Sequence, residues 1–351
     1  MLICENKDGL IIGHQCGYHL PRTLEPSVFN TMLNNLEELN NANDIIKLLY
    51  DTIQNSYKLP YIIAYHYLPA NILLKIIENS ENNQFSLRFT NVDYMNDTTD
   101  GKHGHSEFYT AIKYSFKKER NNSELLQELQ KELYNGFSKL FIKNSCTRNE
   151  NSSTLFMVDG NLYKAYVCSL SLDSESLPLW RTYGGGFGES YAIGLNTHYL
   201  TDICVCRIEY SNFSSENRFF PVKIIDKIIN ECNNGTISKS DIQNIVYALT
   251  ELSSAWSISR KEYVWAYEKE IRLVKFMPVG SEPDGYSVRD GVFRPYINVK
   301  FDNKYLQEVI VGPMVERSNA AISIDEYMSS KRFGGGREKL QVRCSVLPVR
   351  F

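Results

Sequence analysis

The sequence lacks the features that mark a membrane protein or a strongly basic nucleic-acid binder. No stretch approaches the roughly 20 apolar residues that span a bilayer, and the N-terminus has no basic segment followed by an apolar run. The net charge is only −3 over 351 residues, which argues against binding nucleic acid by bulk electrostatics, although a local basic groove stays open. We therefore expect a soluble protein with no membrane partner, in a cytoplasm that is either the cell's own or a host's.

Cysteine and glycine patterns exclude further classes. The eight cysteines are scattered without a Cys-x-x-Cys pair, which predicts free thiols in a reducing compartment. No Gly-x-Gly-x-x-Gly opens a strand–helix unit and no Gly-x-x-x-x-Gly-Lys-Ser/Thr occurs, so neither a Rossmann dehydrogenase nor a P-loop enzyme is indicated. Gly334-Gly-Gly336 precedes Arg337 and predicts a flexible turn.

One polar loop could in principle bind a metal ion. His103 and His105 stand close to Asp97, Asp100 and Glu107 in the sequence. A His-x-His pair in a flexible loop lacks the ligand spacing of zinc sites, however. We therefore expect no metal.

The order of the predicted elements favours an α+β protein. With 43% hydrophobic residues the chain can bury a sizeable core. Apolar residues at helical spacing predict a mostly helical extension over 1–58, and helical insertions at about 106–141 and 220–260 within a main domain over 59–351. Short strands lie between these blocks, too close together to be joined by parallel crossovers, so we expect mostly antiparallel sheets.

The predicted strands are β-branched or aromatic runs bounded by polar residues. They cover residues 61–67, 85–89, 164–171, 191–195, 204–210, 270–276, 296–301, 308–311 and 340–347. The polar residues 144–161 predict a long loop, and residues 323–328 a last helix.

Two carboxylates, Glu268 and Glu270, stand one residue apart where an aromatic, helix-compatible segment gives way to a strand. Side chains alternate in an extended segment, so both would point to the same face. Like charges on one face repel and gain nothing for folding. Such a pair is useful only where that face looks into a wet cleft and a substrate needs both carboxylates. The alternative is a solvated strand edge, where Glu and Lys alternate for solubility.

Two further groupings lie in predicted strands. His66 stands between Tyr65 and Tyr67, where a histidine is more often a hydrogen-bonded core residue than a catalytic one. Ser169 and Ser171 share one face of the next long strand, which is unremarkable by itself.

A third grouping precedes a cluster of glycines. Trp180, Arg181 and Tyr183 offer a guanidinium and flat rings beside a backbone that anions can approach closely. A Trp-anchored turn with a salt-bridged arginine is the alternative.

In this order the motifs resemble a widespread bacterial family of unknown function that is placed among the ADP-ribosyltransferase-like proteins. They are Tyr-His-Tyr, Asn96-Asp97, Ser-x-Ser, Trp-Arg-x-Tyr with a trailing glycine, and Glu-x-Glu-x-Arg. The resemblance runs from about Tyr61 to Pro313. It implies a split antiparallel sheet pair that clamps NAD in a cleft, so that residues 59–351 would form the catalytic domain.

The resemblance also implies roles for matching residues. His66 would contact the adenosine-side ribose, Ser169 and Ser171 would support the nicotinamide pocket, and Glu270 would hold the nicotinamide ribose. Glu268 matches the glutamate that orients the acceptor in arginine-directed members. A histidine in the first motif is usual in one branch, and Ser-x-Ser with Glu-x-Glu in another, which leaves the acceptor open.

Residue type alone suggests the remaining roles. Arg181 could hold the diphosphate, Tyr183 or Trp180 could stack on nicotinamide, and Tyr67 joins His66 in the NAD-binding set. We expect an NAD-dependent mono-ADP-ribosyltransferase acting on a macromolecule, either a protein side chain such as arginine or a nucleic-acid base. NAD is then a substrate. The role could be that of a toxin, an effector, a phage-defence protein or a housekeeping enzyme. The alternatives are an NAD glycohydrolase and a catalytically silent module that senses NAD or another nucleotide.

Overall fold

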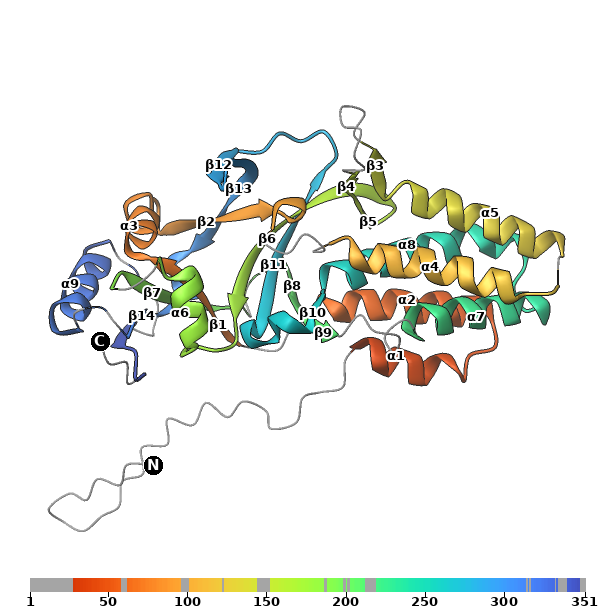
Figure 1. Ribbon diagram of the computed structural model, residues 1–351, viewed down its shortest axis with the longest axis horizontal. Coiled ribbons are helices and arrows are strands. Elements are labelled where there is room, and N and C mark those ends of the chain that lie inside the picture. The colour runs from red at the N-terminus through yellow and green to blue at the C-terminus, as the bar shows by residue number, and fades with distance from the viewer. Residues whose placement is uncertain are drawn as a thin grey trace, which may run out of the picture.

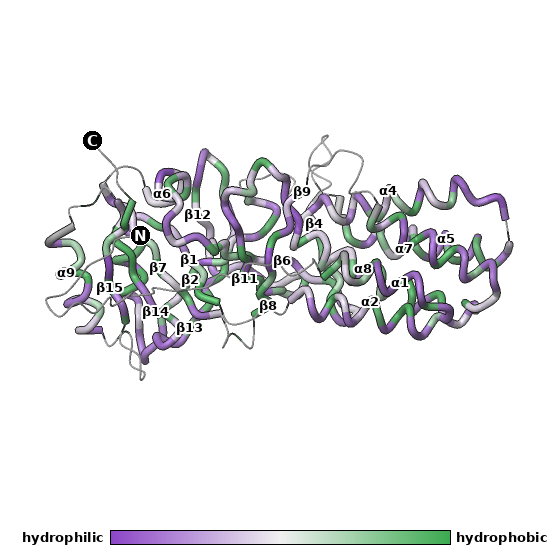
Figure 2. The backbone as a smooth tube through the Cα atoms, turned by 90° about the horizontal axis from the view of Figure 1, so that it is seen from below, coloured by the Kyte–Doolittle hydropathy of each residue, from purple (hydrophilic) through white to green (hydrophobic). Residues whose placement is uncertain are grey.

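The structure is a computed structural model of an elongated molecule, with a helical bundle at one end and a large sheet at the other (Figures 1 and 2). It describes residues 28–57, 62–95, 101–121, 123–143, 152–185, 188–197, 200, 203–211, 219–313, 315, 317–331, 333 and 340–347. Several predictions fall outside these residues: any structure before Val28, the Asn96-Asp97 motif, residues 144–151 of the loop predicted over 144–161, and the turn at Gly334-Gly-Gly336.

The helical bundle is built from segments that lie far apart in the sequence. Its helices are α1 (Val28–Leu36), α2 (Ala42–Ser56), α4 (His103–Lys118), α5 (Glu124–Ser138), α7 (Phe219–Asn233) and α8 (Ile242–Ile258). Their apolar faces pack into one hydrophobic core, and Figure 2 shows hydrophobic positions recurring along each helix. The helices predicted as an N-terminal extension and those predicted as insertions therefore belong to one structural unit.

Helix α8 lies at the centre of this unit, and α4 crosses it very closely at Gly104. A Cβ atom at Gly104 would lie 2.6 Å from the Cα and backbone nitrogen of Ser257. Glycine is needed there because a side chain would collide with the backbone of α8, which cannot rotate away.

We predict that Gly104→Ala destabilises the protein. Overpacking costs about 1–3 kcal/mol, which exceeds the roughly 0.5–1 kcal/mol that alanine gains over glycine inside a helix. Gly136→Ala on α5 is the matched control, because its Cβ would meet a side-chain methyl of Val246 at 2.7 Å and not backbone. Denaturant unfolding should show a larger loss for Gly104→Ala; equal losses would contradict the argument.

The large sheet is mostly antiparallel, as predicted. Its order is β12-β13-β2-β6-β1-β7-β14-β15, with β11 joined to β6 and β8, and β5 joined to β6. These strands are β1 (Ile63–Pro69), β2 (Gln84–Asn91), β5 (Phe156–Val158), β6 (Asn161–Ser171), β7 (Ser190–Asn196), β8 (Cys204–Arg207), β11 (Glu270–Pro278), β12 (Gly285–Arg289), β13 (Val292–Asp302), β14 (Leu306–Val311) and β15 (Gln341–Cys344). The parallel pairs are β14 with β15 and, in a small separate sheet, β9 (Glu209–Ser211) with β10 (Arg260–Glu262).

Strand β6 organises this sheet, because strands from three directions meet along it (Figure 1). One edge pairs with β11 from Tyr163 to Ser171. The other edge is divided among β5, β2 and, at Ser171 alone, β1. The sheet therefore branches where β1, β6 and β11 come together, and Ser171 is paired with both Tyr65 and Glu270 at that point.

Two segments have a secondary structure that was not predicted from the sequence. Residues 152–161, predicted as loop, form β4 (Ser152–Thr154), β5 and the start of β6, because Leu155 and Phe156 are buried in the core. The Trp-Arg-x-Tyr segment forms the short helix α6 (Leu177–Tyr183), with Pro178 in its first turn, where a missing N–H costs nothing. The remaining helices are α3 (Ala70–Glu78) and α9 (Arg317–Ser330).

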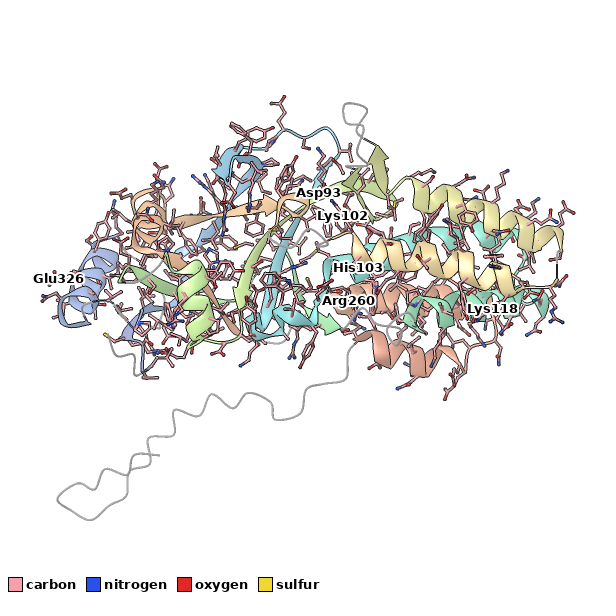
Figure 3. All side chains as sticks on the ribbon, viewed as in Figure 1. Asp93, Lys102, His103, Lys118, Arg260 and Glu326 are labelled. Carbon is pink, nitrogen blue, oxygen red and sulfur yellow. The ribbon has the colours of Figure 1, made fainter. Side chains whose placement is uncertain are left out.

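The predicted histidine loop begins a helix. Figure 3 places His103 at the sheet end of α4 and Lys118 at its far end. His105 is fully buried in the bundle, with Nδ1 3.0 Å from Ser253 Oγ, and Glu107 accepts a hydrogen bond from Trp256 Nε1. Among the described residues, no group of His, Cys, Asp and Glu side chains comes together as metal ligands.

Burial lowers the pKa of His105 to about 3, against an ordinary value of 6.5. Between these values the unfolded chain binds a proton that the folded protein does not, so stability is lost as pH falls below 6.5. The slope approaches about 1.4 kcal/mol per pH unit. We predict that the wild type loses about 2 kcal/mol more than His105→Gln between pH 7.5 and 5.0, measured by urea unfolding. Parallel pH profiles would show that His105 does not titrate in this way.

Two further expectations concern the cysteines and membrane-spanning helices. The cysteines that the structure describes are free thiols. Cys4, Cys16 and Cys146 fall outside the described residues. In the part of the chain that is described, no helix combines the length and the apolar character required to cross a bilayer.

Candidate active site

The candidate site lies at the branch of the sheet, where a short 3-10 helix meets β11. The 3-10 helix spans Tyr263–Glu268, Lys269 adopts a left-handed conformation with φ 45°, and β11 begins at Glu270. The sequence suggested an extended segment through both glutamates, but the structure has a 3-10 helix and a left-handed turn before β11. The turn at Lys269 brings the two carboxylates to the same point all the same, because both contact one lysine.

Glu270 is held by three side chains and is 2% exposed. Its Oε1 accepts hydrogen bonds from Ser169 Oγ at 2.5 Å and Arg272 Nε at 2.9 Å. Its Oε2 lies 3.1 Å from Lys261 Nζ and 3.3 Å from Arg272 Nη2. The backbone N–H of Glu270 donates to the hydroxyl of Tyr210 on β9 at 2.7 Å. Every polar atom around this carboxylate thus restricts its orientation.

Glu268 is held in a similar way and is 5% exposed. Tyr183 on α6 donates its hydroxyl to Oε1 at 2.7 Å, and Lys261 Nζ donates to Oε2 at 2.6 Å. Ser171 Oγ donates to the backbone carbonyl of Glu268 at 2.6 Å. The last turn of the 3-10 helix is therefore attached to the end of β6.

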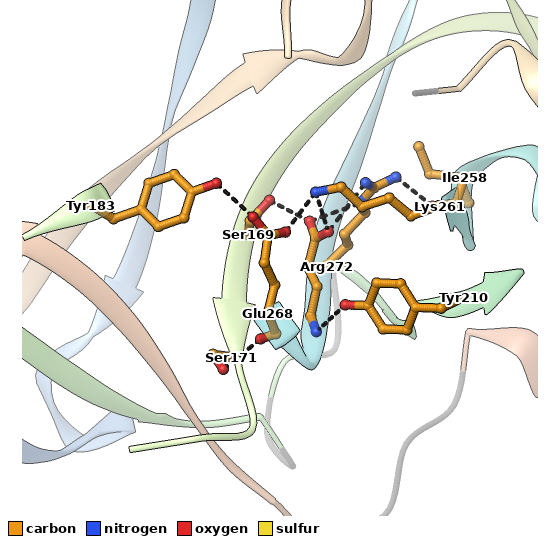
Figure 4. A network of polar contacts seen from close by, with 9 residues as sticks. Ser169, Ser171, Tyr183, Tyr210, Ile258, Lys261, Glu268 and Arg272 are labelled. Carbon is orange, nitrogen blue, oxygen red and sulfur yellow. Dashed lines mark hydrogen bonds and ion pairs between the residues drawn. The ribbon is translucent and has the colours of Figure 1, made fainter. Parts of the chain in front are cut away.

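Lys261 on β10 bridges the two carboxylates, and Arg272 on β11 supplies a second cation. Figure 4 shows both cations reaching the cluster from one side, opposite Tyr183. Arg272 is fully buried and also donates Nη1 to the carbonyl of Ile258 at 2.9 Å. Two negative and two positive side chains give this cluster a formal charge of zero. The expected wet cleft, and equally a solvated strand edge, is replaced by a buried, neutralised ion-pair network.

Burial alone would raise the pKa of Glu270, because the charged form loses hydration. Arg272 and Lys261 oppose this through their charges, and the hydrogen bonds from Arg272 and Ser169 add to them. The net result is that the pKa of Glu270 lies well below its ordinary value of 4.5. Glu270 is therefore an anion throughout the neutral range.

The network coincides with the part of the chain that matches a known family. The family model of a protein of unknown function (DUF2971) matches residues 179–273. The matched segment begins in α6 and ends in β11, so it contains Tyr183, Lys261, Glu268, Glu270 and Arg272. No curated protein and no solved structure matches the chain.

Strands β1 and β6 supply the remaining partners, outside the matched segment. His66 on β1 and Ser169 on β6 are half-buried, and His66 Nδ1 lies 3.0 Å from the carbonyl oxygen of Ser169. Burial lowers the pKa of His66 despite this contact. A neutral ring that donates Nδ1–H to that carbonyl leaves Nε2 as an acceptor.

Two aromatic residues that were predicted to bind NAD pack into the protein interior. Tyr67 and Trp180 are buried and pack edge to face, with ring centroids 4.6 Å apart. The Tyr67 hydroxyl donates to the Asp173 carbonyl at 2.6 Å and accepts from the Ser176 N–H at 3.1 Å. These contacts hold the loop before α6 and so position Tyr183. Packing accounts for both buried rings, while Arg181 lies on the exposed side of α6.

The sequence did not single out Lys261 or Tyr210 as members of the network, nor the contact of Arg272 with Glu270. Arg272 was part of the Glu-x-Glu-x-Arg pattern, and alternation along a strand should have placed it on the same face as Glu270. Lys261 lies in a three-residue strand before an irregular segment, where no periodicity indicates direction.

Proposed function

We propose that this protein is an NAD-dependent mono-ADP-ribosyltransferase whose reacting centre is the Glu268–Glu270 pair. The observation that carries the proposal is the convergence of His66, Ser169, Glu268 and Glu270 from separate elements at the branch of the sheet. The resemblance to ADP-ribosyltransferase-like proteins assigns His66, Ser169 and Glu270 to NAD, and Glu268 to the acceptor. The antiparallel, branched sheet supports the same fold assignment.

The chemistry requires one permanently ionised carboxylate. Breaking the bond between nicotinamide and ribose builds positive charge on the sugar carbon and ring oxygen, as in glycoside hydrolysis. A fixed carboxylate beside the ribose stabilises that charge as it develops. Glu270 suits this task because Arg272, Lys261 and Ser169 keep it ionised and fixed in orientation.

The leaving group makes no further demand on the site. Nicotinamide departs as a neutral base and needs no protonation, so a single carboxylate suffices for cleavage. Glu268 is then available to take the proton of the incoming nucleophile. Tyr183, which bonds Glu268, and Ser169, which bonds Glu270, are only half-buried.

Neighbouring apolar side chains favour a macromolecular acceptor. Tyr263 and Val264, on the same 3-10 helix as Glu268, are 60% and 67% exposed. Large contiguous apolar patches are typical of surfaces that contact another macromolecule, and these two residues would form part of such a patch. An NAD glycohydrolase, which needs only water as acceptor, has no use for them.

One observation favours a second candidate, the catalytically silent NAD- or nucleotide-sensing module. Both carboxylates are almost completely buried and fully paired, as in a network that only holds β10, the 3-10 helix and β11 together. In that case NAD would bind without being cleaved.

Label transfer separates these functions. Purified protein is incubated with NAD labelled on the adenosine side and with bacterial or eukaryotic lysate, and free nicotinamide and labelled macromolecules are measured. Transferase activity predicts label on one macromolecule with wild type and none with Glu270→Gln. Nicotinamide release without label would indicate a glycohydrolase. Calorimetric NAD binding without nicotinamide release would indicate the silent module.

A further inference from the structure

We infer that Lys261 makes this site selective for an uncharged nucleophile and excludes a cationic acceptor such as a guanidinium. This inference rests on the proposed function and concerns the acceptor side of the same site. Lys261 belongs to none of the motifs that suggested NAD chemistry, and its position follows from the geometry alone.

Glu268, the carboxylate available to an acceptor, is already paired with a cation. Its Oε2 lies 2.6 Å from the Lys261 ammonium and its Oε1 accepts from the Tyr183 hydroxyl. An ion pair this short, with side chains only 6% and 7% exposed, already neutralises Glu268. A guanidinium gains from a carboxylate chiefly through charge and paired hydrogen bonds, and here the charge is already matched.

The charges of the whole cluster are already balanced. Lys261 also contacts Glu270 at 3.1 Å, and Arg272 contacts the same carboxylate at 2.9 Å. A cationic acceptor would add a third positive charge to two carboxylates in a buried place, where like charges repel with little screening. The ammonium cannot simply move away, because it lies over the ring of Trp265 at 5.0 Å as well as between the two acids.

A neutral nucleophile can still bind to Glu268. A carboxylate oxygen accepts more than one hydrogen bond, so Glu268 can still accept an O–H or N–H from a neutral group. The nucleophile attacks C1′ of the nicotinamide ribose, and the C1′–N bond breaks with its electron pair passing to nicotinamide. The proton of the nucleophile passes to Glu268 and then to solvent. The products are the ADP-ribosylated acceptor, neutral nicotinamide and one proton.

Two small probes test the selectivity: methanol, which is neutral, and methylguanidine, which is a cation. Both probes are supplied together with NAD in one reaction, to wild type, Lys261→Arg, Lys261→Met or Lys261→Gln. The ratio of ADP-ribosyl-methylguanidine to methyl-ADP-ribose is then measured. Because both products come from the same sample, a partly unfolded fraction cancels from the ratio. Lys261→Gln keeps a hydrogen-bond donor without the charge, and decides the result should Lys261→Met be inactive.

We expect wild type and Lys261→Arg to form the methanol product and almost none of the methylguanidine product. Removing the charge should raise the ratio at least about tenfold, the equivalent of one relieved charge repulsion of about 1.4 kcal/mol. A wild type that modifies methylguanidine as readily as the uncharged variants would overturn the inference while leaving the transferase intact. Uncharged variants that make methyl-ADP-ribose but still reject methylguanidine would equally show that Lys261 is not the cause. Absence of nicotinamide release from every protein would refute the proposed function itself, and the inference with it.

Discussion

Glu270→Gln is expected to lower the rate of nicotinamide release from NAD by at least about 100-fold, the usual cost of losing a preorganised charge at the reacting centre. Glutamine keeps the size of the side chain and can still accept a hydrogen bond from Ser169, but it carries no charge to stabilise the developing oxocarbenium ion. Because that interaction strengthens only in the transition state, kcat should fall far more than KM changes. Steady-state release of nicotinamide measures both.

The control must separate lost chemistry from lost folding, because Glu270→Gln leaves Lys261 and Arg272 with one carboxylate fewer. Glu262→Gln removes a half-buried carboxylate from the end of β10, next to Lys261. It should keep its rate within about threefold, since it lies outside the network. The folded fraction of each protein is measured by circular dichroism under the assay conditions. A folded Glu270→Gln protein with unchanged turnover would refute the role given to this carboxylate.

Arg272→Met is expected to have the largest effect on stability, a loss of about 3–5 kcal/mol in the free energy of unfolding. Arg272 is fully buried and bonds both Glu270 and the carbonyl of Ile258. Methionine fills similar space but leaves a buried carboxylate with one cation fewer and a carbonyl without this donor. Denaturant unfolding at pH 7 measures the loss.

Two variants accompany this measurement. Arg289→Met replaces an arginine whose side chain is 52% exposed, and should change stability by less than about 0.5 kcal/mol. The double variant Arg272→Met with Glu270→Gln removes both charges of the pair. It should be more stable than the sum of the single losses predicts, because neither charge is then left buried alone. Strict additivity would mean that the pair is not coupled.

Much of the local structure was predictable, because it depends on periodicity within short segments. Runs of β-branched and aromatic residues predicted β6 and β11, and apolar residues at helical spacing predicted the helices of the bundle. Ser169 and Glu270 were both selected as site residues, and they are hydrogen-bonded partners on neighbouring strands. Polar side chains near strand ends thus selected residues that the structure brings into contact.

Other features could not be predicted because they depend on contacts between distant segments. Tyr67 and Trp180 have side chains that suit a ligand or a core equally well, and only their packing against each other places them in the core. Helices α1 and α2 share one bundle with α7 and α8 because the second half of α8 is buried on every side, which no single segment reveals.

The sequence by itself determined the α+β order, the antiparallel pairing and the positions of the two carboxylates, because side-chain alternation and helical spacing are local properties of the chain. Only the tertiary structure decided that these carboxylates are buried and neutralised by Lys261 and Arg272. The electrostatics of such a site depend on distances between groups on separate elements, and the left-handed turn at Lys269 that sets one of these distances has no periodic signal.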